Sequence, residues 1–343
     1  MMGPTGLHKL KDGGHLIVRS LQYQNYFGDG SFKIVVFRTD KSGRMLWYRL
    51  ISEKGFRDIT VGDMFLTSNN GDQEGLLFVE NYAMKFATSS GEVILEKRYE
   101  DNLKGQVFTS VFYVSPQQII AGTAQGNLLS INPGDLAVIW NQTNANRTGA
   151  IVAINVDSKK NIYYIFRDNK DRYTNIRIHK CNANGEFLKD FLFDGTLPNE
   201  YNWGYRMTSL LVDDQDNLYM FGRNSDYGFL RYFKFNTDGT VLKKNLKSDN
   251  LLAEKSFFNE NGEIVVFGQI DGGGLNTYTG IYVFDKEMNI KSKLFYTNIP
   301  PHIVRGITGN PDGSYNIFLN YMQTYTYENS NFVFIQTDAN GKI

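Results

Sequence analysis

Short runs in which apolar and polar residues alternate recur along the whole chain. The stretch FRTDKSGRMLWYRL (37–50) sets the pattern, with one such run, a polar turn that ends in glycine, and a second run. A period of two residues is typical of β-strands with one buried face, and a turn of this composition is typical of a hairpin. No segment keeps a 3.6-residue apolar period for more than one or two helical turns. We therefore expect little helix.

The turn in this stretch returns six more times. The seven copies recur at intervals of 43 to 54 residues and end at Gly43, Gly91, Gly134, Gly185, Gly239, Asn289 and Gly341. A regular interval over a whole chain indicates a repeat architecture. A side chain that can accept a backbone hydrogen bond stands three residues before the glycine at Asp40, Thr88, Asn182, Asn236 and Asp338. These positions predict Asx or ST turns closed by a glycine at positive φ.

A second set of turns, each followed by a β-rich run such as IVVFG (264–268), divides every repeat into four strands. Seven four-stranded antiparallel units of this length predict a seven-bladed β-propeller, an all-β fold. We expect one domain, 1–343, with blades at approximately 5–52, 58–101, 107–143, 149–194, 205–248, 252–297 and 303–343. The strands number roughly 27 where 28 would complete seven blades. Either the last blade is incomplete or the natural chain continues.

One repeat has a family resemblance. The unit QGNLLSINPGDLAVIW (125–140) resembles the blades of quinoprotein-like propellers, a group that includes the propeller subunit of the bacterial outer-membrane assembly machinery. The resemblance implies that a tryptophan near the end of the outer strand packs between blades, and Trp47 and Trp140 match that position. It implies no quinone cofactor here, because the paired cysteines of some such enzymes cannot exist with Cys181 alone.

Two kinds of loop follow from this strand order. One face of the blades has uniformly tight turns, whereas the loops between second and third strands and the links between blades are longer and rich in aromatic residues. Binding sites usually lie on variable loops of a rigid scaffold. The predicted binding residues in these loops are Tyr23, Tyr26, Phe27, Tyr173, Tyr201, Trp203, Tyr205, Arg206, Tyr227, Tyr278, Tyr325 and Tyr327.

This aromatic face favours a non-catalytic role, as a scaffold or accessory subunit that recognises a protein partner, because Tyr, Trp and Arg anchor protein interfaces. The alternative is a propeller that binds or processes a glycan with the same face, since rings beside Asp and Asn can stack on sugars. A third alternative is a metal- or cofactor-dependent enzyme. No spacing singles out a catalytic pair, and catalytic residues stay unassigned.

Composition narrows the partners and the compartment. The formal net charge is +0 with 36 basic and 36 acidic residues, which argues against nucleic acid because phosphate binding needs a clustered basic excess. No apolar run is long enough for a transmembrane helix. We expect no cofactor. The low cysteine content and the resemblance favour an extracytoplasmic location, with any leader absent from this numbering, and a cytoplasmic chain is the alternative.

Two candidate chemical groups have simpler explanations. His179 aligns with apolar positions of the matching strands in other repeats, and Cys181 aligns with Thr39 and Phe235, which favours packing over catalysis or ligation. The acidic stretch DDQDN (213–217) has the oxygen ligands that Ca²⁺ prefers, but it occupies a turn position present in every repeat. We therefore expect a hairpin turn there and predict no metal site.

Overall fold

A computed structural model describes eleven segments of the chain: 6–24, 30–51, 61–69, 72–143, 149–168, 176–193, 205–224, 230–271, 277–297, 302–322 and 330–343. They belong to two compact units, 1–145 and 146–343. The described part contains 27 strands and one short helix, α1 (Glu100–Leu103). No helix in this part is long and apolar enough to cross a membrane.

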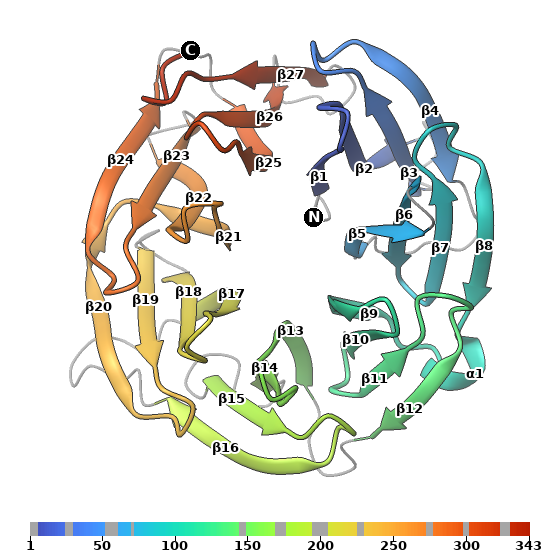
Figure 1. Ribbon diagram of the computed structural model, residues 1–343, viewed down its shortest axis with the longest axis vertical. Coiled ribbons are helices and arrows are strands. Elements are labelled where there is room, and N and C mark those ends of the chain that lie inside the picture. The colour runs from blue at the N-terminus through green and yellow to red at the C-terminus, as the bar shows by residue number, and fades with distance from the viewer. Residues whose placement is uncertain are drawn as a thin grey trace. The chain divides into compact units, whose positions relative to one another are not determined.

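The first unit contains three antiparallel sheets, here called the first, second and third blades. Their strands are β1 (Gly6–Lys9), β2 (His15–Gln24), β3 (Gly30–Thr39) and β4 (Met45–Ile51); β5 (Val61–Asn69), β6 (Asp72–Val79), β7 (Tyr82–Ala87) and β8 (Val93–Arg98); and β9 (Phe108–Ser115), β10 (Gln118–Thr123), β11 (Leu128–Ile131) and β12 (Val138–Gln142). The first strands β1, β5 and β9 lie along one edge of this unit, and β4, β8 and β12 lie along the opposite edge (Figure 1).

The second unit contains the fourth to seventh blades. Their strands are β13 (Gly149–Val156), β14 (Ile162–Asp168), β15 (Ile176–Cys181) and β16 (Phe187–Phe193); β17 (Tyr205–Val212), β18 (Leu218–Asn224), β19 (Leu230–Phe235) and β20 (Val241–Asp249); β21 (Leu252–Phe258), β22 (Ile264–Asp271), β23 (Thr277–Phe284) and β24 (Ile290–Tyr296); and β25 (His302–Gly309), β26 (Tyr315–Met322) and β27 (Ser330–Gln336). The predicted class is confirmed: the chain is an all-β, seven-bladed β-propeller whose last blade has three strands in the described residues.

The hairpin turns close as the sequence predicts. Asp40 Oδ1 accepts the backbone N–H groups of Ser42 at 2.9 Å and Arg44 at 3.0 Å, and Gly43 has φ 86°. Asn182 and Asp338 accept the same two backbone bonds, and Asn236 accepts the second of them, from Thr240. A short polar side chain thus satisfies backbone donors that the turn leaves outside the strand ladder, and glycine adopts the left-handed backbone without a Cβ penalty.

Three turns differ from the expectation. The Thr88 hydroxyl donates to the Gln73 carbonyl at 2.8 Å instead of accepting a bond within its own turn. In the third and sixth blades the left-handed residue is Leu136 (φ 58°) or Met288 (φ 63°), and not Gly134 or Asn289. Both side chains are buried, with 0% and 1% of their surface exposed. Their burial offsets the strain that a positive φ imposes on a residue with a Cβ atom.

Neighbouring blades pack through these turns. A Cβ atom added to Gly239 would lie 1.9 Å from Phe191 of the preceding blade, and one added to Gly341 would lie 2.4 Å from Leu294. Each glycine therefore leaves room for a side chain from the fourth strand of the blade before it. Basic side chains add to this contact, since Lys189 donates to the Asp238 carbonyl at 2.8 Å.

Within each unit, hydrophobic cores fill the spaces between neighbouring blades. Leu16 and Val36 of the first blade lie in one buried cluster with Leu77 and Phe86 of the second. The second, fifth and sixth blades have such clusters on both faces, and their middle strands are apolar on both faces, as in IVVFG (264–268). Burial of these side chains is the dominant favourable term in the stability of such a fold.

One position in this core holds a histidine. His15 begins β2 and has 0% of its surface exposed, whereas the matching positions of the fourth and fifth blades hold Ile162 and Leu218. Burial, followed by the positive charge of Lys9, lowers the pKa of His15 to about 4. The neutral imidazole is therefore the form that the folded blade accommodates.

We expect Gly239→Ala to lower the free energy of unfolding by about 2–4 kcal/mol. The new methyl group meets the Phe191 ring and must also adopt φ 91°, so overpacking and backbone strain add. Gly262→Ala is the matched control, because its φ is 72° and its nearest neighbour, Lys286 Cε, is 3.6 Å from the added Cβ. Urea unfolding of both variants measures the difference. Equal losses would contradict the packing role of Gly239.

We expect stability to fall as the pH drops from about 6.5 to about 4, because the unfolded His15 binds a proton in this range and the folded one does not. The slope is at most about 1.4 kcal/mol for each pH unit. His15→Leu, which installs the residue found at the matching position 218, should flatten this part of the profile. Hydrogen bonds lower the pKa of Asp40 and Asp238 in the fold. The stability that these carboxylates contribute is therefore lost at lower pH, in the unmodified protein and in the variant alike. An unchanged slope in the variant, measured by urea unfolding at each pH, would exclude His15 as the cause.

Candidate functional site

Most of the binding residues predicted from the loops lie outside the described residues. These are Tyr26, Phe27, Tyr173, Tyr201, Trp203, Tyr227, Tyr325 and Tyr327. The backbone is described at Tyr23 in β2 and at Tyr205 and Arg206 in β17, but their side chains are not. Tyr278 in β23 is half-buried and pairs with Ile270 of β22. The aromatic loop face therefore stays a prediction.

The fourth strands of the first six blades share a feature that the alternation pattern does not reveal. Each carries one extra residue relative to the third strand, a β-bulge at the same place in every blade. The extra residues are Leu46, Ile94, Ile139, Leu188, Leu242 and Lys291. The five aliphatic ones have 47% to 55% of their surface exposed. Because they recur with the bulge, these exposed aliphatic residues follow from blade geometry.

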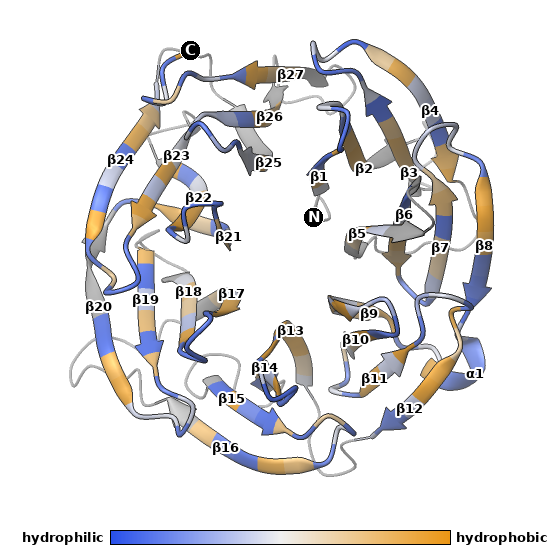
Figure 2. Cartoon of the chain, in the orientation of Figure 1, coloured by the Kyte–Doolittle hydropathy of each residue, from blue (hydrophilic) through white to orange (hydrophobic). Residues whose placement is uncertain are grey.

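β4 departs from this common pattern at Tyr48. Tyr48 has 65% of its surface exposed, and Met45 and Leu50 beside it have 57% and 44% exposed. Together with Leu46 these residues form what we call the β4 patch. The hydropathy colouring shows apolar stretches toward both ends of β4 with one polar stretch between them (Figure 2). Exposed apolar residues are common singly, but a contiguous group of them marks an interaction surface.

Position 48 distinguishes β4 from the other fourth strands. Two residues after the bulge, the other five blades have the polar or charged residues Glu96, Asn141, Asp190, Lys244 and Lys293. Such residues on an edge strand prevent unwanted pairing with other chains. Only Arg49 is charged within β4, whereas β20 has four charged residues among its nine. At position 48, β4 therefore lacks the polar or charged residue that the other five fourth strands have.

The opposite face of β4 is fixed against the second blade. The Trp47 indole N–H donates to the Thr88 carbonyl at 3.1 Å, and its ring meets Phe86 edge-to-face at 6.3 Å. Arg49 Nη1 donates to the Gly91 carbonyl at 3.0 Å. Trp47 thus packs between blades, as the sequence resemblance implied. Because this face is anchored, the β4 patch is presented on a rigid strand.

The acidic turn is a hairpin, as predicted. Asp213 accepts the backbone N–H groups of Gln215 and Asn217, and its second oxygen accepts the Tyr219 hydroxyl at 2.7 Å. Asp214 pairs with Lys286 of the next blade, and hydrogen bonds from Ser158 lower the pKa of Asp216. The carboxylates therefore point to three different sets of donors instead of one ion. Within the described segments, no three His, Cys, Asp or Glu side chains gather as a metal site requires.

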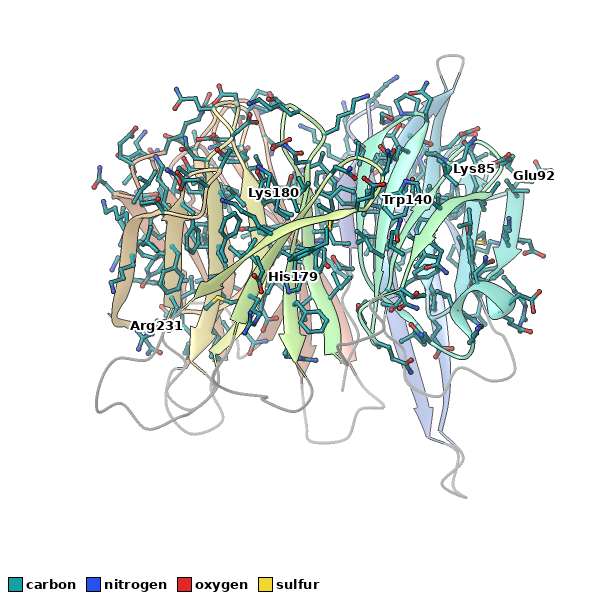
Figure 3. All side chains as sticks on the ribbon, turned by 90° about the horizontal axis from the view of Figure 1, so that it is seen from below. Lys85, Glu92, Trp140, His179, Lys180 and Arg231 are labelled. Atoms are coloured by element: carbon teal, nitrogen blue, oxygen red, sulfur yellow. The ribbon has the colours of Figure 1, made fainter. Side chains whose placement is uncertain are left out.

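His179 lies inside the fourth blade and has 0% of its surface exposed (Figure 3). Its ring stacks on Tyr164 with centroids 4.9 Å apart and contacts Phe166 and Phe187. The Tyr164 hydroxyl lies 3.3 Å from His179 Nδ1. Burial raises the pKa of the Cys181 thiol to about 11, which removes thiolate reactivity at neutral pH. These observations support the packing role predicted for both residues.

A buried ion pair lies in the second blade. Lys85 Nζ is 2.7 Å from Glu74 Oε2, and each side chain has 10% of its surface exposed. The sequence pattern did not single out this pair, because neither residue has a distinctive neighbour in the chain. A buried pair of opposite charges satisfies itself and needs no ligand. We therefore assign it to the blade's interior.

No family model matches the sequence, and a search of curated protein sequences finds no match. Solved structures are similar in fold. A protein of unknown function from Bacteroides caccae has 15% identity and a TM-score of 0.52, with 79% of this chain and 92% of that chain covered. A catalytically inactive virginiamycin B lyase from Staphylococcus aureus, solved with quinupristin, has 13% identity and a TM-score of 0.61, with 93% and 91% covered.

Raptor from Chaetomium thermophilum is also similar, with 11% identity and a TM-score of 0.67. The match covers 100% of this chain but 29% of the Raptor chain. At these identities the three structures share the fold with this chain, and a shared fold does not carry an activity from one protein to another.

Proposed function

We propose that this protein is a non-catalytic binding propeller that contacts other proteins. The observation that carries the proposal is the β4 patch, in which Met45, Leu46, Tyr48 and Leu50 are all at least 44% exposed on one strand. A large ring with a polar hydroxyl, surrounded by aliphatic side chains, is typical of the anchors of protein interfaces. The patch has none of the carboxylate or histidine groups that catalysis of acyl or glycosyl transfer would require.

The aromatic loops are the second part of the proposal. Their tyrosines and Trp203 would recognise a protein partner on a different surface from the β4 patch. This division suits a scaffold, because one surface can hold a partner while the other contacts a second protein. The support is the sequence alone, through the concentration of rings in loops that lie outside the described residues.

The finer family assignment and the compartment also belong to the proposal. The contact of Trp47 with Phe86 and Thr88 supports a likeness to quinoprotein-like propellers of the outer-membrane-assembly type. A single cysteine, Cys181, buried to 2% exposure, suits an oxidising compartment, because no exposed thiol can cross-link the chain. We therefore propose an extracytoplasmic location.

A photo-activated cross-linking amino acid in place of Tyr48 should form a covalent adduct with another protein chain on illumination in the native source. The same substitution at Leu242 is the matched control, since Leu242 is an aliphatic bulge residue with 52% exposure on a different outer strand. Mass spectrometry of the adducts is the measurement. If position 48 gives no more adduct than position 242, the β4 patch is not a protein contact.

The combined substitution of Trp203→Ala and Tyr205→Ala should abolish binding of a co-purifying partner, because interface rings account for much of the binding free energy. The melting temperature should change by no more than about 2 °C if both rings are exposed. Co-elution of the partner and thermal unfolding are the two measurements. Retained binding in the double variant would remove the aromatic loops from the proposal and leave the β4 patch unaffected.

A further inference from the structure

The structure points to one occupant for the β4 patch, and we propose that it is a second copy of this chain, paired antiparallel along β4. This inference rests on the proposed protein contact at the patch. β4 is the last strand of the first blade's sheet, with β3 on its other side. Antiparallel addition of a second β4 would continue the same hydrogen-bond ladder.

The sequence of β4 complements itself when the pair is centred on Tyr48. In that register Tyr48 faces the Tyr48 of the second copy, and Leu46 faces Leu50 in both directions. Tyr48 and Leu50 share one face of the sheet with their β3 partners Phe37 and Val35, which are half-buried. The pairing therefore joins two apolar surfaces on one side of an extended sheet. Cross-strand aromatic and aliphatic pairs of this kind stabilise antiparallel sheets.

The charges on β4 select this register. Centring on Tyr48 places Arg49 opposite Trp47 of the second copy, so that the two guanidinium groups do not face each other. A shift of the centre to Arg49 would oppose the two Arg49 side chains, and a shift to Trp47 would oppose Leu50 and Arg44. Like charges directly opposite each other destabilise a strand pair. A change of the pairing register by one residue would place Tyr48 opposite Trp47 or Arg49. The apolar face of one copy would then point away from that of the other.

Three other fourth strands, β12, β20 and β24, do not complement themselves in this way. Self-pairing of β20 (VLKKNLKSD) or β24 (IKSKLFY) would bring lysines of the two copies close together. β12 (VIWNQ) has no charge but is five residues long and has two amides at its end. Among the described fourth strands, β4 is the one that combines an aromatic centre with aliphatic residues on both sides.

Disulfide trapping tests the register. Tyr48→Cys should give a covalent dimer under mild oxidation, because facing residues of an antiparallel pair lie about 4.5–5.5 Å apart at Cα, within reach of a disulfide. Leu242→Cys should stay monomeric, and Cys181 is buried and does not react. A mixture of Leu46→Cys and Leu50→Cys proteins should give a mixed dimer that neither protein gives alone.

Sedimentation of the unmodified chain should show a concentration-dependent dimer. Tyr48→Lys should abolish the dimer, because it would place two lysines opposite each other. The variant should still fold, since lysines occupy the matching positions 244 and 293 in other blades. Leu242→Lys should leave the dimer unchanged. A monomer at all concentrations, or equal trapping at positions 48 and 242, would overturn the proposed dimer. If the photo-adduct at position 48 then contains a different protein, the proposed function stands without the dimer. If there is no adduct of either kind, the dimer and the protein contact proposed for the β4 patch are both wrong.

Discussion

The contact between a fourth-strand side chain and the glycine turn of the next blade connects local chemistry to the arrangement of the blades. Phe191 occupies the space that a Cβ atom of Gly239 would need, and Leu294 does the same at Gly341. The glycine is thus required twice, once by its positive φ and once by the neighbouring side chain. A hairpin that satisfied only its own backbone would leave the outer strand before it without a close contact.

This double requirement explains why the repeated phrase in the sequence is structural. Where a copy forms its own Asx turn and also receives a side chain of the preceding blade, as at Gly239 and Gly341, the turn residues have little freedom to bind a ligand. The oxygens of Asp40 and Asp213, for example, are occupied by donors within their own hairpins. Binding surfaces are therefore expected where the repeat is broken. Tyr48 is such a position, because the matching residues of the other fourth strands are polar or charged.

The sequence was sufficient for those features that depend on local rules. The turn positions, the number of strands and the packing of His179 follow from alternation, from turn chemistry and from alignment of the repeats. The bulges in the fourth strands could not be predicted, because an extra residue appears only when two strands are paired. The positive φ at Leu136 and Met288 depends on burial of their side chains. The exposure of Tyr48 was also missed, because WYRL (47–50) reads as an ordinary strand until the elements packed against it are known.

The edge strand β4 can either be protected from other chains by a polar side chain or pair with another strand. An edge strand with unpaired N–H and C=O groups is exposed to association with other chains, and a lysine at its centre is the usual protection. β20 and β24 follow this rule at Lys244 and Lys293, while β4 has Tyr48 at that position. A ring on a rigid strand loses little conformational entropy on contact, and it brings a large apolar surface. Contact with a specific partner strand therefore stabilises an edge of this composition more than contact with water does. The aromatic residue at this one position, where the other five described fourth strands have an amide or a charge, is thus itself an argument that the strand is covered in use.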